Sequence, residues 1–335
     1  MGPIKVIQTL VNTLTNVTEI KINVFYLDRI VDPQVKMNVP VERLIPWRFP
    51  FCEYEIVHTN GIRPDFFAFV HRKKIKYHIS TIHNLVFEDL LFTYNSAISW
   101  IFGNLWLILW RRTDRLVCLS KSMKNYYNKW LPNSKLEVIY NGISEDDNSF
   151  ISDSDLVENI NSLRSKGLII IGTTGVLTRR KGIDQVMYLM AQKKEIALVI
   201  IGEGREKTIL QNLARKLELN ERILFCGFRE NAVSYFKYFD FFIMPSRSEG
   251  FGLALVEAVQ QKVPVLCSDL NVFHELFNND EVTFYRLENL KSLCDALEVA
   301  KESGNVKVEL AFNRYMNYYT GNAMAMHYLE LYNTA

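Results

Sequence analysis

The chain has 335 residues, of which 48% are hydrophobic and 23% are charged, and this composition is that of an ordinary globular protein. Its length exceeds what one hydrophobic core usually fills, so we expect two domains. The formal net charge of +2 gives no electrostatic footprint for nucleic acid, and we expect no nucleic-acid partner. The five cysteines are scattered and form no C-x-x-C pair, which argues against a disulfide framework or a structural zinc site and favours a reducing compartment.

The first fifty residues are atypical for a chain of this kind. Met1, Gly2 and Pro3 lead directly into the helical pattern IKVIQTLVNTL, and the strand-like IKINVFYL follows. A chain built on two parallel sheets should open with an apolar strand and a glycine-rich turn, so we expect that first strand to be missing. The segment also lacks the pattern of a secretory signal, which together with the cysteine usage predicts a cytoplasmic protein.

Short apolar strands alternate with helical patterns in the first half of the chain. Strands are expected at 54–59, 77–83, 115–120 and 135–141, and a long apolar helix is expected after Asp89. This alternation is typical of a parallel, doubly wound sheet with helices on its faces.

A polar and acidic segment at 142–155 interrupts this rhythm and indicates a linker. Beyond it, strands are expected at 167–176, 196–202, 222–228, 240–246, 263–269 and 282–287. We therefore predict an α/β protein with two doubly wound, Rossmann-like domains at residues 1–147 and 148–315. A C-terminal helix at about 316–335 is expected to pack back on the first domain.

One segment, SAISWIFGNLWLILWRR at 96–112, is almost wholly apolar. It is too short to span a bilayer, which needs about 20 apolar residues. Two interpretations stay open: a buried helix, or a surface helix that rests on a membrane through its tryptophans with cations at the headgroups. The residues concerned are Trp100, Trp106 and Trp110, Arg111 and Arg112, and the nearby Lys73, Lys74 and Lys76.

Cations and glycines follow several of the strands predicted in the second half. Loops at the carboxyl ends of parallel strands are where open α/β sheets bind ligands. Lys181 follows the first of these strands, and Gly250 and Gly252 follow the fourth, where they allow backbone N–H groups to approach a ligand closely. A helix that begins near Leu253 points its positive end to the same place. Together these groups predict an anion site whose natural occupant is a diphosphate.

Two glutamates flank this glycine-rich loop. Glu249 lies in the loop, where it can accept hydrogen bonds from the hydroxyl groups of a ligand. Glu257 lies in the following helix among apolar residues, where burial of a carboxylate requires partners. Purely structural roles are the alternatives: a charge at a helix amino terminus for Glu249, and an exposed helix position for Glu257.

The segment PSRSEGFGLALVEAVQQKVPVLCSD at 245–269 resembles a motif of the retaining glycosyltransferases of family 4, which have the two-domain GT-B fold. The similarity lies in two glutamates eight positions apart around Gly-Phe-Gly, followed by Pro-Val and Ser-Asp. Other segments resemble further family elements in the same order: TIHNLVFED at 81–89, VIYNGI at 138–143, GVLTRRKGID at 175–184 and the β-α-β pattern at 200–228. The resemblance extends from about residue 53 to the end of the chain.

This resemblance implies two domains that face each other across a cleft, the second of which binds a nucleotide sugar. Glu249 would contact the sugar hydroxyls, Glu257 would hold the ribose, and Lys181 would neutralise the diphosphate leaving group. His83 would line the reacting centre from the first domain, with His58 as a rival by position. The other residues that the resemblance and the loop positions assign to the donor are Gly175, Arg179, Arg180, Arg229, Gly250, Phe251, Gly252 and Leu253.

The resemblance further implies that no cofactor and no metal is needed, because cations and helix dipoles stabilise the departing nucleoside diphosphate. The anomeric configuration would be retained. One departure from the family concerns the phosphate loop, where Val176 follows Gly175 in place of the usual arginine. Arg179 or Arg180 could replace that missing cation.

The leading hypothesis is a transferase that moves a hexose from a nucleotide sugar to a glycan or lipid-linked acceptor in cell-surface polysaccharide synthesis. A lipid-linked acceptor would favour peripheral contact with the inner face of the membrane. The atypical start and Val176 motivate an alternative, a non-catalytic or incomplete nucleotide-sugar-binding subunit. A nucleotide-sugar epimerase with the same two-domain architecture is a third hypothesis.

Overall fold

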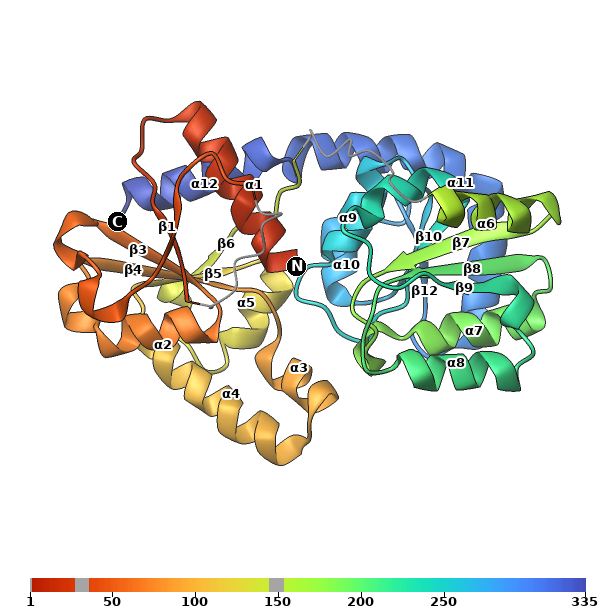
Figure 1. The fold of residues 1–335 in the computed structure, drawn as a ribbon, viewed down its shortest axis with the longest axis horizontal. Coiled ribbons are helices and arrows are strands. Elements are labelled where there is room, and N and C mark those ends of the chain that lie inside the picture. The colour runs from red at the N-terminus through yellow and green to blue at the C-terminus, as the bar shows by residue number, and fades with distance from the viewer. Residues whose placement is uncertain (1, 28–35, 145–153) are drawn as a thin grey trace. The chain divides into compact units, whose positions relative to one another are not determined.

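The structure is a computed structural model that describes residues 2–27, 36–144 and 154–335. The chain divides into two compact units, unit 1 (Met1–Glu145 with Asn317–Ala335) and unit 2 (Asp146–Met316). Both units contain a parallel sheet flanked by helices, so the predicted α/β class is confirmed (Figure 1). The domain boundary predicted between residues 147 and 148, and most of the predicted linker, lie outside the described residues.

The main sheet of unit 1 has four parallel strands that pair in chain order. They are β3 (Ile56–Asn60), β4 (Tyr77–Ile82), β5 (Arg115–Cys118) and β6 (Leu136–Val138). The inner strands β4 and β5 are buried along nearly their whole length, as strands with helices on both faces are. A separate two-stranded parallel sheet joins β1 (Val24–Tyr26) to β2 (Val41–Arg43).

Helices cover both faces of the four-stranded sheet (Figure 1). Those of unit 1 are α1 (Gly2–Val17), α2 (Ile62–Val70), α3 (Val86–Thr93), α4 (Ser96–Arg111), α5 (Lys121–Tyr127) and α12 (Gly321–Asn333), with 3-10 turns η1 (Pro46–Arg48), η2 (Phe51–Glu53), η3 (Arg72–Lys74) and η4 (Asn133–Lys135). The first helical pattern of the sequence is confirmed by α1, which packs against α12. The single long helix expected after Asp89 is instead two helices, α3 and α4.

Two tyrosines of α12 form hydrogen bonds to the sheet of unit 1. The Tyr332 hydroxyl hydrogen-bonds His58 Nδ1 at 2.8 Å, and the Tyr328 hydroxyl hydrogen-bonds Thr81 Oγ1 at 2.9 Å. His58 Nε2 also hydrogen-bonds Thr81 Oγ1 at 2.8 Å, so both of its ring nitrogens have structural partners. The end of the chain is therefore part of unit 1.

A buried carboxylate organises the interior of unit 1. Asp65, on α2, accepts hydrogen bonds from the hydroxyl groups of Thr59 at 2.5 Å and Ser80 at 2.7 Å. The indole N–H groups of Trp106 and Trp110, on α4, donate to its other oxygen at 3.2 Å and 2.9 Å. Burial raises the pKa of Asp65, and these four donors oppose the rise. The network thus connects two helices and two strands through one side chain.

The hydrogen bonds from Trp106 and Trp110 to Asp65 also fix which side of α4 faces the interior. Trp110 is 1% exposed and Trp106 is partly buried, whereas Trp100 is 68% exposed. The helix is therefore half buried, and the hypothesis that all three tryptophans rest on a membrane is wrong, because two of them turn inward to Asp65. Among the described residues, none of the helices has the length and hydropathy needed to cross a bilayer.

Unit 2 contains a six-stranded parallel sheet with the order β12-β11-β10-β7-β8-β9. The strands are β7 (Ile169–Thr174), β8 (Ile196–Ile201), β9 (Ile223–Phe225), β10 (Phe241–Met244), β11 (Val265–Ser268) and β12 (Thr283–Tyr285). Each lies inside a strand predicted from the sequence. The chain winds outward from β7 in one direction and from β10 in the other, which is the doubly wound arrangement. The switch point between β7 and β10 is where such sheets bind ligands.

The helices of unit 2 lie on both faces of this sheet, with α7 and α8 on one side and α9 and α10 on the other (Figure 1). Their bounds are α6 (Ser154–Ser165), α7 (Ile183–Gln192), α8 (Lys207–Lys216), α9 (Leu253–Gln260), α10 (Asn271–Leu276) and α11 (Leu290–Tyr318), with 3-10 turns η5 (Arg179–Lys181), η6 (Asn220–Arg222) and η7 (Ala232–Tyr238). A continuous apolar core joins the sheet to α7, α8 and the start of α11. This rigid base supports the loops at the switch point.

Candidate functional site

Two loops meet at the switch point of unit 2, one after β7 and the other after β10. The Arg247 N–H donates to the Arg180 carbonyl at 2.7 Å, and Gln185 Nε2 donates to the Pro245 carbonyl at 2.9 Å. Gly182 has a φ of +66°, and a Cβ atom there would lie 2.0 Å from the Pro245 carbonyl oxygen. Only glycine therefore allows the η5 turn to approach the β10 loop this closely.

An ion cluster forms where these loops meet. Lys181 Nζ donates to Glu249 Oε1 at 2.8 Å, and Arg180 Nη1 lies 3.1 Å from Glu249 Oε2. The Ser246 hydroxyl donates to Glu249 Oε1 at 2.8 Å. Gly175 completes the surroundings, because a Cβ atom there would lie 3.3 Å from the aliphatic stem of Lys181. The structure thus brings together three residues that the sequence analysis had placed in the site, Glu249, Lys181 and Arg180, with Gly175 beside them.

The environment of Glu249 keeps its carboxyl group ionised. Its side chain is only 10% exposed, and burial alone would raise the pKa of its carboxyl group. Lys181 and Arg180 outweigh burial and lower this pKa from 4.5 to about 2. Glu249 is therefore an anion at every physiological pH, and it can accept but not donate hydrogen bonds.

Arg247 stabilises the ion cluster through hydrogen bonds that link the β10 loop to the η5 turn and to α7. Its Nη1 and Nη2 atoms donate to the two carboxylate oxygens of Asp184 at 2.9 and 2.7 Å, and Nη1 also donates to the Arg179 carbonyl at 2.6 Å. Its Nε atom bonds Glu288, and these acids raise the pKa of Arg247. Sequence reasoning missed Arg247 and Asp184, although each lies within three residues of a predicted site residue. Their role is to hold the η5 turn against the β10 loop.

The glycine-rich loop leads into α9 as predicted, with Leu253 as the first residue of that helix. Gly252 precedes it with a φ of +100°, and a Cβ atom there would lie 2.6 Å from the Phe273 ring. The Phe251 side chain is 3% exposed, which leaves the backbone of the loop rather than this ring to meet a ligand. Glu257 is half buried on α9, one turn beyond Leu253. The N–H groups at the start of α9 and its dipole favour an anion at this end.

Two of the predicted cations lie apart from the cluster. Arg179 is exposed, and only its carbonyl oxygen takes part in the contacts with Arg247. Arg229 follows β9, two strands away from the switch point, and its Nη1 atom donates to the Phe228 carbonyl at 3.0 Å. Val176, which stands where the family usually has arginine, is 62% exposed.

His83 follows β4 in unit 1. Its Nε2 atom is hydrogen-bonded at 2.9 Å to the side-chain oxygen of Asn60, at the end of β3. Burial lowers the pKa of His83 from 6.5 to about 4, so the ring is neutral at pH 7. With Asn60 as acceptor, Nε2 carries the proton and Nδ1 presents its lone pair. The pKa of His58, the rival candidate, is lowered to about 3, mainly by burial, and its ring serves to hold α12.

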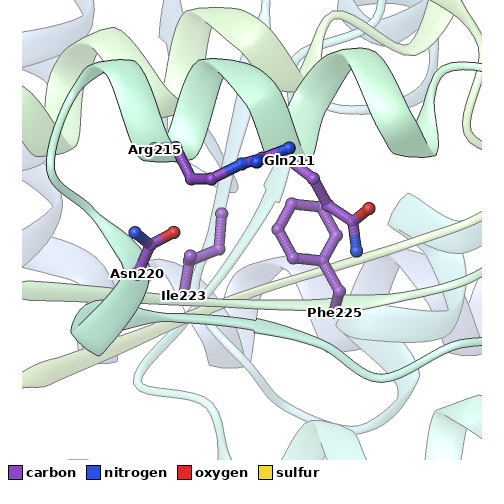
Figure 2. A pocket seen from close by; sticks show the side chains of 5 residues that line it. All are labelled: Gln211, Arg215, Asn220, Ile223 and Phe225. Carbon is purple, nitrogen blue, oxygen red and sulfur yellow. The ribbon is translucent and has the colours of Figure 1, made fainter.

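Unit 2 also contains a hollow that is lined by residues of α8, η6 and β9 (Figure 2). It has a volume of about 310 Å³ between α8 and β9, with Gln211 and Arg215 on the helix side and Ile223 and Phe225 on the strand side. Arg215 bonds the neighbouring Asn212 rather than pointing into an anion site. Within residues 2–27, 36–144 and 154–335, no group of three or more His, Cys, Asp or Glu side chains could hold a metal ion.

Comparisons with known proteins identify the family. The model described as Glycosyltransferase Family 4 matches residues 17–147, and the model described as Glycosyl transferases group 1 matches residues 158–311. The O-antigen biosynthesis glycosyltransferase WclY of Escherichia coli is 35% identical over 342 residues, which cover 99% of this chain and 94% of that protein. The doubly wound sheet and its switch-point loops are thus those of a sugar transferase. The chain belongs to the group 1 (family 4) glycosyltransferases and is an enzyme of that class.

Further similarities agree with this assignment. The UDP-Gal:alpha-D-GlcNAc-diphosphoundecaprenol alpha-1,3-galactosyltransferase of Escherichia coli is 24% identical over 257 residues, covering 73% of this chain and 66% of that protein. HepE of Anabaena in complex with UDP and glucose matches with a TM-score of 0.80 at 15% identity, covering 100% of this chain and 96% of that one. Sucrose-phosphate synthase of Thermosynechococcus elongatus also has a TM-score of 0.80, at 17% identity, with coverages of 98% and 92%. The two structures confirm the predicted GT-B fold.

Proposed function

We propose that this glycosyltransferase moves a hexose from a nucleoside diphosphate sugar to a glycan or lipid-linked acceptor, with retention of the anomeric configuration. The observation that carries the proposal is the Lys181–Glu249 ion pair at the switch point, beside the amino terminus of α9. Lys181, a cation that could bind a diphosphate, thereby lies beside Glu249, an anion that could accept hydrogen bonds from sugar hydroxyls. The names of the Escherichia coli relatives support a role in the synthesis of a cell-surface polysaccharide.

The diphosphate of the donor is proposed to lie against the start of α9. Backbone N–H groups of Gly250, Phe251, Gly252 and Leu253 would bind its oxygens together with the positive end of the helix dipole. Lys181 adds a full positive charge from the η5 turn. Glu257, one turn into α9, is proposed to accept hydrogen bonds from the ribose hydroxyls.

The ion cluster supplies electrostatic stabilisation during transfer. As the bond between the sugar and the diphosphate breaks, negative charge develops on the leaving oxygen, and Lys181 is already held in place to meet it. Arg180 stays beside Glu249 Oε2 and keeps that carboxylate ionised when Lys181 turns its charge toward phosphate. Glu249 can then orient the sugar through its hydroxyl groups. No metal or other cofactor is proposed to take part.

His83 is proposed to act on the sugar or the acceptor as a neutral hydrogen-bonding group. Its depressed pKa and its bond to Asn60 support a lone pair at Nδ1 that can accept a hydrogen bond from a hydroxyl group. The remaining donor contacts proposed from the sequence are Gly175, Arg179 and Arg229.

The test is turnover of UDP-, GDP- and ADP-linked sugars by the purified chain, with nucleotide release measured with and without mixed glycan acceptors. Release from one donor that increases with acceptor, and proton NMR of a product with the donor's anomeric configuration, would support the proposal. An inverted product would refute retention. A free sugar epimer formed without acceptor would show an epimerase instead.

The alternative stated from the sequence, a nucleotide-sugar-binding subunit without activity of its own, disagrees with the family assignment. One observation had motivated it. Val176 is 62% exposed at the phosphate loop, where it contributes no positive charge. Under this alternative, a nucleoside diphosphate would raise the melting temperature while no donor is turned over. Multiple turnovers by the isolated chain would exclude it.

A further inference from the structure

A buried amide on the first turn of α7 contacts the loops that form the ion cluster. Gln185 is 7% exposed, and the residues that follow it, Val186 and Met187, belong to the apolar core of unit 2. Burial of an amide costs free energy unless its nitrogen and its oxygen both find hydrogen-bond partners. The partners of Gln185 are backbone groups of three different loops.

The amide nitrogen of Gln185 joins two of these loops. Nε2 donates to the Pro245 carbonyl, in the loop after β10, at 2.9 Å, and to the Gly182 carbonyl, directly after η5, at 3.4 Å. A Cβ atom at Gly182 would lie only 2.5 Å from Nε2, so the backbone at the end of η5 packs directly on this amide. The contact lies one residue along the chain from Lys181.

The amide oxygen of Gln185 adds a third loop, the one after β12. Oε1 accepts a hydrogen bond from the Glu288 N–H at 3.0 Å. Glu288 has a φ of +58°, a left-handed conformation that costs free energy in a residue with a side chain and persists only where the surroundings hold it. Its carboxylate accepts a hydrogen bond from Arg247 Nε. Both the main chain and the side chain of Glu288 are therefore held beside the ion cluster.

These contacts hold the backbone of Lys181 on both sides. Arg247 contacts the two preceding residues, because its N–H donates to the Arg180 carbonyl at 2.7 Å and its Nη1 to the Arg179 carbonyl at 2.6 Å. Gln185 contacts the residue that follows. The Lys181 side chain itself pairs with an acid of the β10 loop. Its ammonium group is thus directed by a backbone that two neighbouring side chains hold in place.

We propose that Gln185 is a positioning residue, which places the Lys181 ammonium group against the donor diphosphate by holding the η5 turn to the loops after β10 and β12. The inference rests on the proposed function, because it takes the diphosphate to bind at Lys181. An amide suits this position because it donates to one loop and accepts from another. The loop after β12 thereby becomes part of the donor site through Glu288.

The test is a double-mutant cycle on the affinity for a nucleoside diphosphate, measured by calorimetric titration of the full chain with UDP, GDP and ADP. Gln185→Met keeps the length of the side chain and removes its hydrogen bonds. It is measured in the parent chain and in Lys181→Met. Gln185→Glu, a second variant of the same shape, keeps an acceptor for the Glu288 N–H and, when ionised, loses the donor to Pro245. Circular dichroism checks that every variant is folded.

Two control variants separate positioning from a general loss of stability. Gln192→Met makes the same substitution at an exposed position, the last residue of the same helix. Arg222→Met removes hydrogen bonds to the carbonyls of Met190 and Ile196, at 3.1 and 2.9 Å, which join η6 to the end of α7 and to β8. Both controls should bind the nucleotide like the parent chain.

We expect both Gln185 variants to weaken binding about threefold or more, and Gln185→Met to change it less than about 1.5-fold in the Lys181→Met background, because Gln185 acts through Lys181. With donor and acceptor, kcat should fall by a larger factor than KM rises, since the charge that Lys181 meets is greatest in the transition state. Unchanged affinity in a folded Gln185 variant, an equal loss in the Lys181→Met background or an equal loss in Arg222→Met would overturn the proposal. A parent chain that binds no nucleotide would instead refute the proposed function, and this inference with it.

Discussion

Lys181 and Glu249 are far apart in sequence yet form one ion pair. The pair offsets part of the cost of burying the two charges. The side chains are 17% and 10% exposed, and Arg180 and Ser246 complete the contacts of the carboxylate. Removal of Glu249 would leave the Lys181 charge partly buried without this partner, whereas removal of Lys181 would leave Glu249 with Arg180 as its remaining cation. The pair is thus both a structural contact between two loops and the proposed centre of donor binding.

Replacement of Glu249 by glutamine tests its role toward the sugar. We expect Glu249→Gln to lower kcat at least tenfold, because an anion that orients the hydroxyl groups is lost. Nucleoside diphosphate affinity should stay equal or increase, since Lys181 is released from its partner. Steady-state kinetics and calorimetry measure the two effects separately. The control is Glu309→Gln, which removes an exposed acid paired with Lys262 at 3.0 Å. Unchanged kcat in folded Glu249→Gln would remove this residue from the mechanism.

The side-chain oxygen of Asn60 determines which nitrogen of the neutral His83 ring carries the proton. We expect Asn60→Asp to raise the pKa of His83 above its value of about 4, because a carboxylate beside Nε2 stabilises the charged ring. Turnover should then fall at low pH and recover as pH rises through the new pKa. The pKa is followed by NMR of the ring protons and the activity by a pH profile. A raised pKa with an unchanged pH profile would show that neutral His83 is not required.

For single residues, the sequence indicated the charged side chains of the ion cluster. It did not indicate the residues that position these side chains through hydrogen bonds. Glu249 and Lys181 belong to motifs with a recognisable spacing and residue type. Arg247 is an exposed-looking cation in the sequence, and only the meeting of two loops shows that it braces Asp184. Asn60 carries no local signal, because its partner His83 comes from the next strand.

Among the elements, α9 depends most on one residue for its placement. Gly252 combines a φ of +100° with close approach to the Phe273 ring. We expect Gly252→Ala to abolish detectable nucleoside diphosphate binding and to destabilise unit 2 by about 1–3 kcal/mol, because the first turn of α9 must shift. Calorimetry and thermal unfolding are the measurements.

Gly167→Ala is the matched control for this change. Gly167 also has a positive φ, +76°, but a Cβ atom there meets nothing within 4 Å, and the residue lies before β7, away from the switch-point loops. It should lose some stability while it keeps nucleotide binding. Equal loss of binding in both variants would mean that strain in general, rather than the position of α9, is responsible.

The elements of unit 2 were well predicted because its strands are short apolar runs between turn signals, and β8, β10 and β11 are buried along their whole length. Unit 1 was harder. The break between α3 and α4 is caused by Asn95, whose side-chain oxygen accepts from the Ile98 N–H at 2.9 Å as a helix cap, and this signal was masked by the apolar residues around it. The inward orientation of Trp106 and Trp110 depends on Asp65, a partner on another helix that composition does not reveal.

For the whole molecule, buried histidines of unit 1 predict a dependence of stability on pH. The pKa values of His58, His78 and His83 are lowered from 6.5 to about 3, 4 and 4, chiefly by burial. Between pH 6.5 and pH 4 the unfolded chain therefore binds more protons than the folded chain. The contribution of these histidines to the free energy of unfolding should be fully present above pH 6.5. It should fall on acidification, by about 1.4 kcal/mol per pH unit for each histidine.

Tryptophan fluorescence can assign this effect, because all five tryptophans lie in unit 1, at positions 47, 100, 106, 110 and 130. We expect the denaturant midpoint followed by this signal to decrease steadily from pH 7 to pH 4.5. A midpoint that stays constant over this range would contradict the assignment of neutral, buried histidines.

The central claim is that a nucleoside diphosphate binds in unit 2 through Lys181 and the start of α9. Its most direct test is calorimetric titration of the folded chain with UDP, GDP and ADP, in the parent and in Lys181→Met. The control is Lys301→Met, which removes a lysine that pairs with Glu195 and Glu298 on unit 2. We expect at least one of these nucleotides to bind, with an affinity about tenfold or more weaker in Lys181→Met and unchanged in Lys301→Met. Equal affinity in the parent and Lys181→Met would contradict this claim.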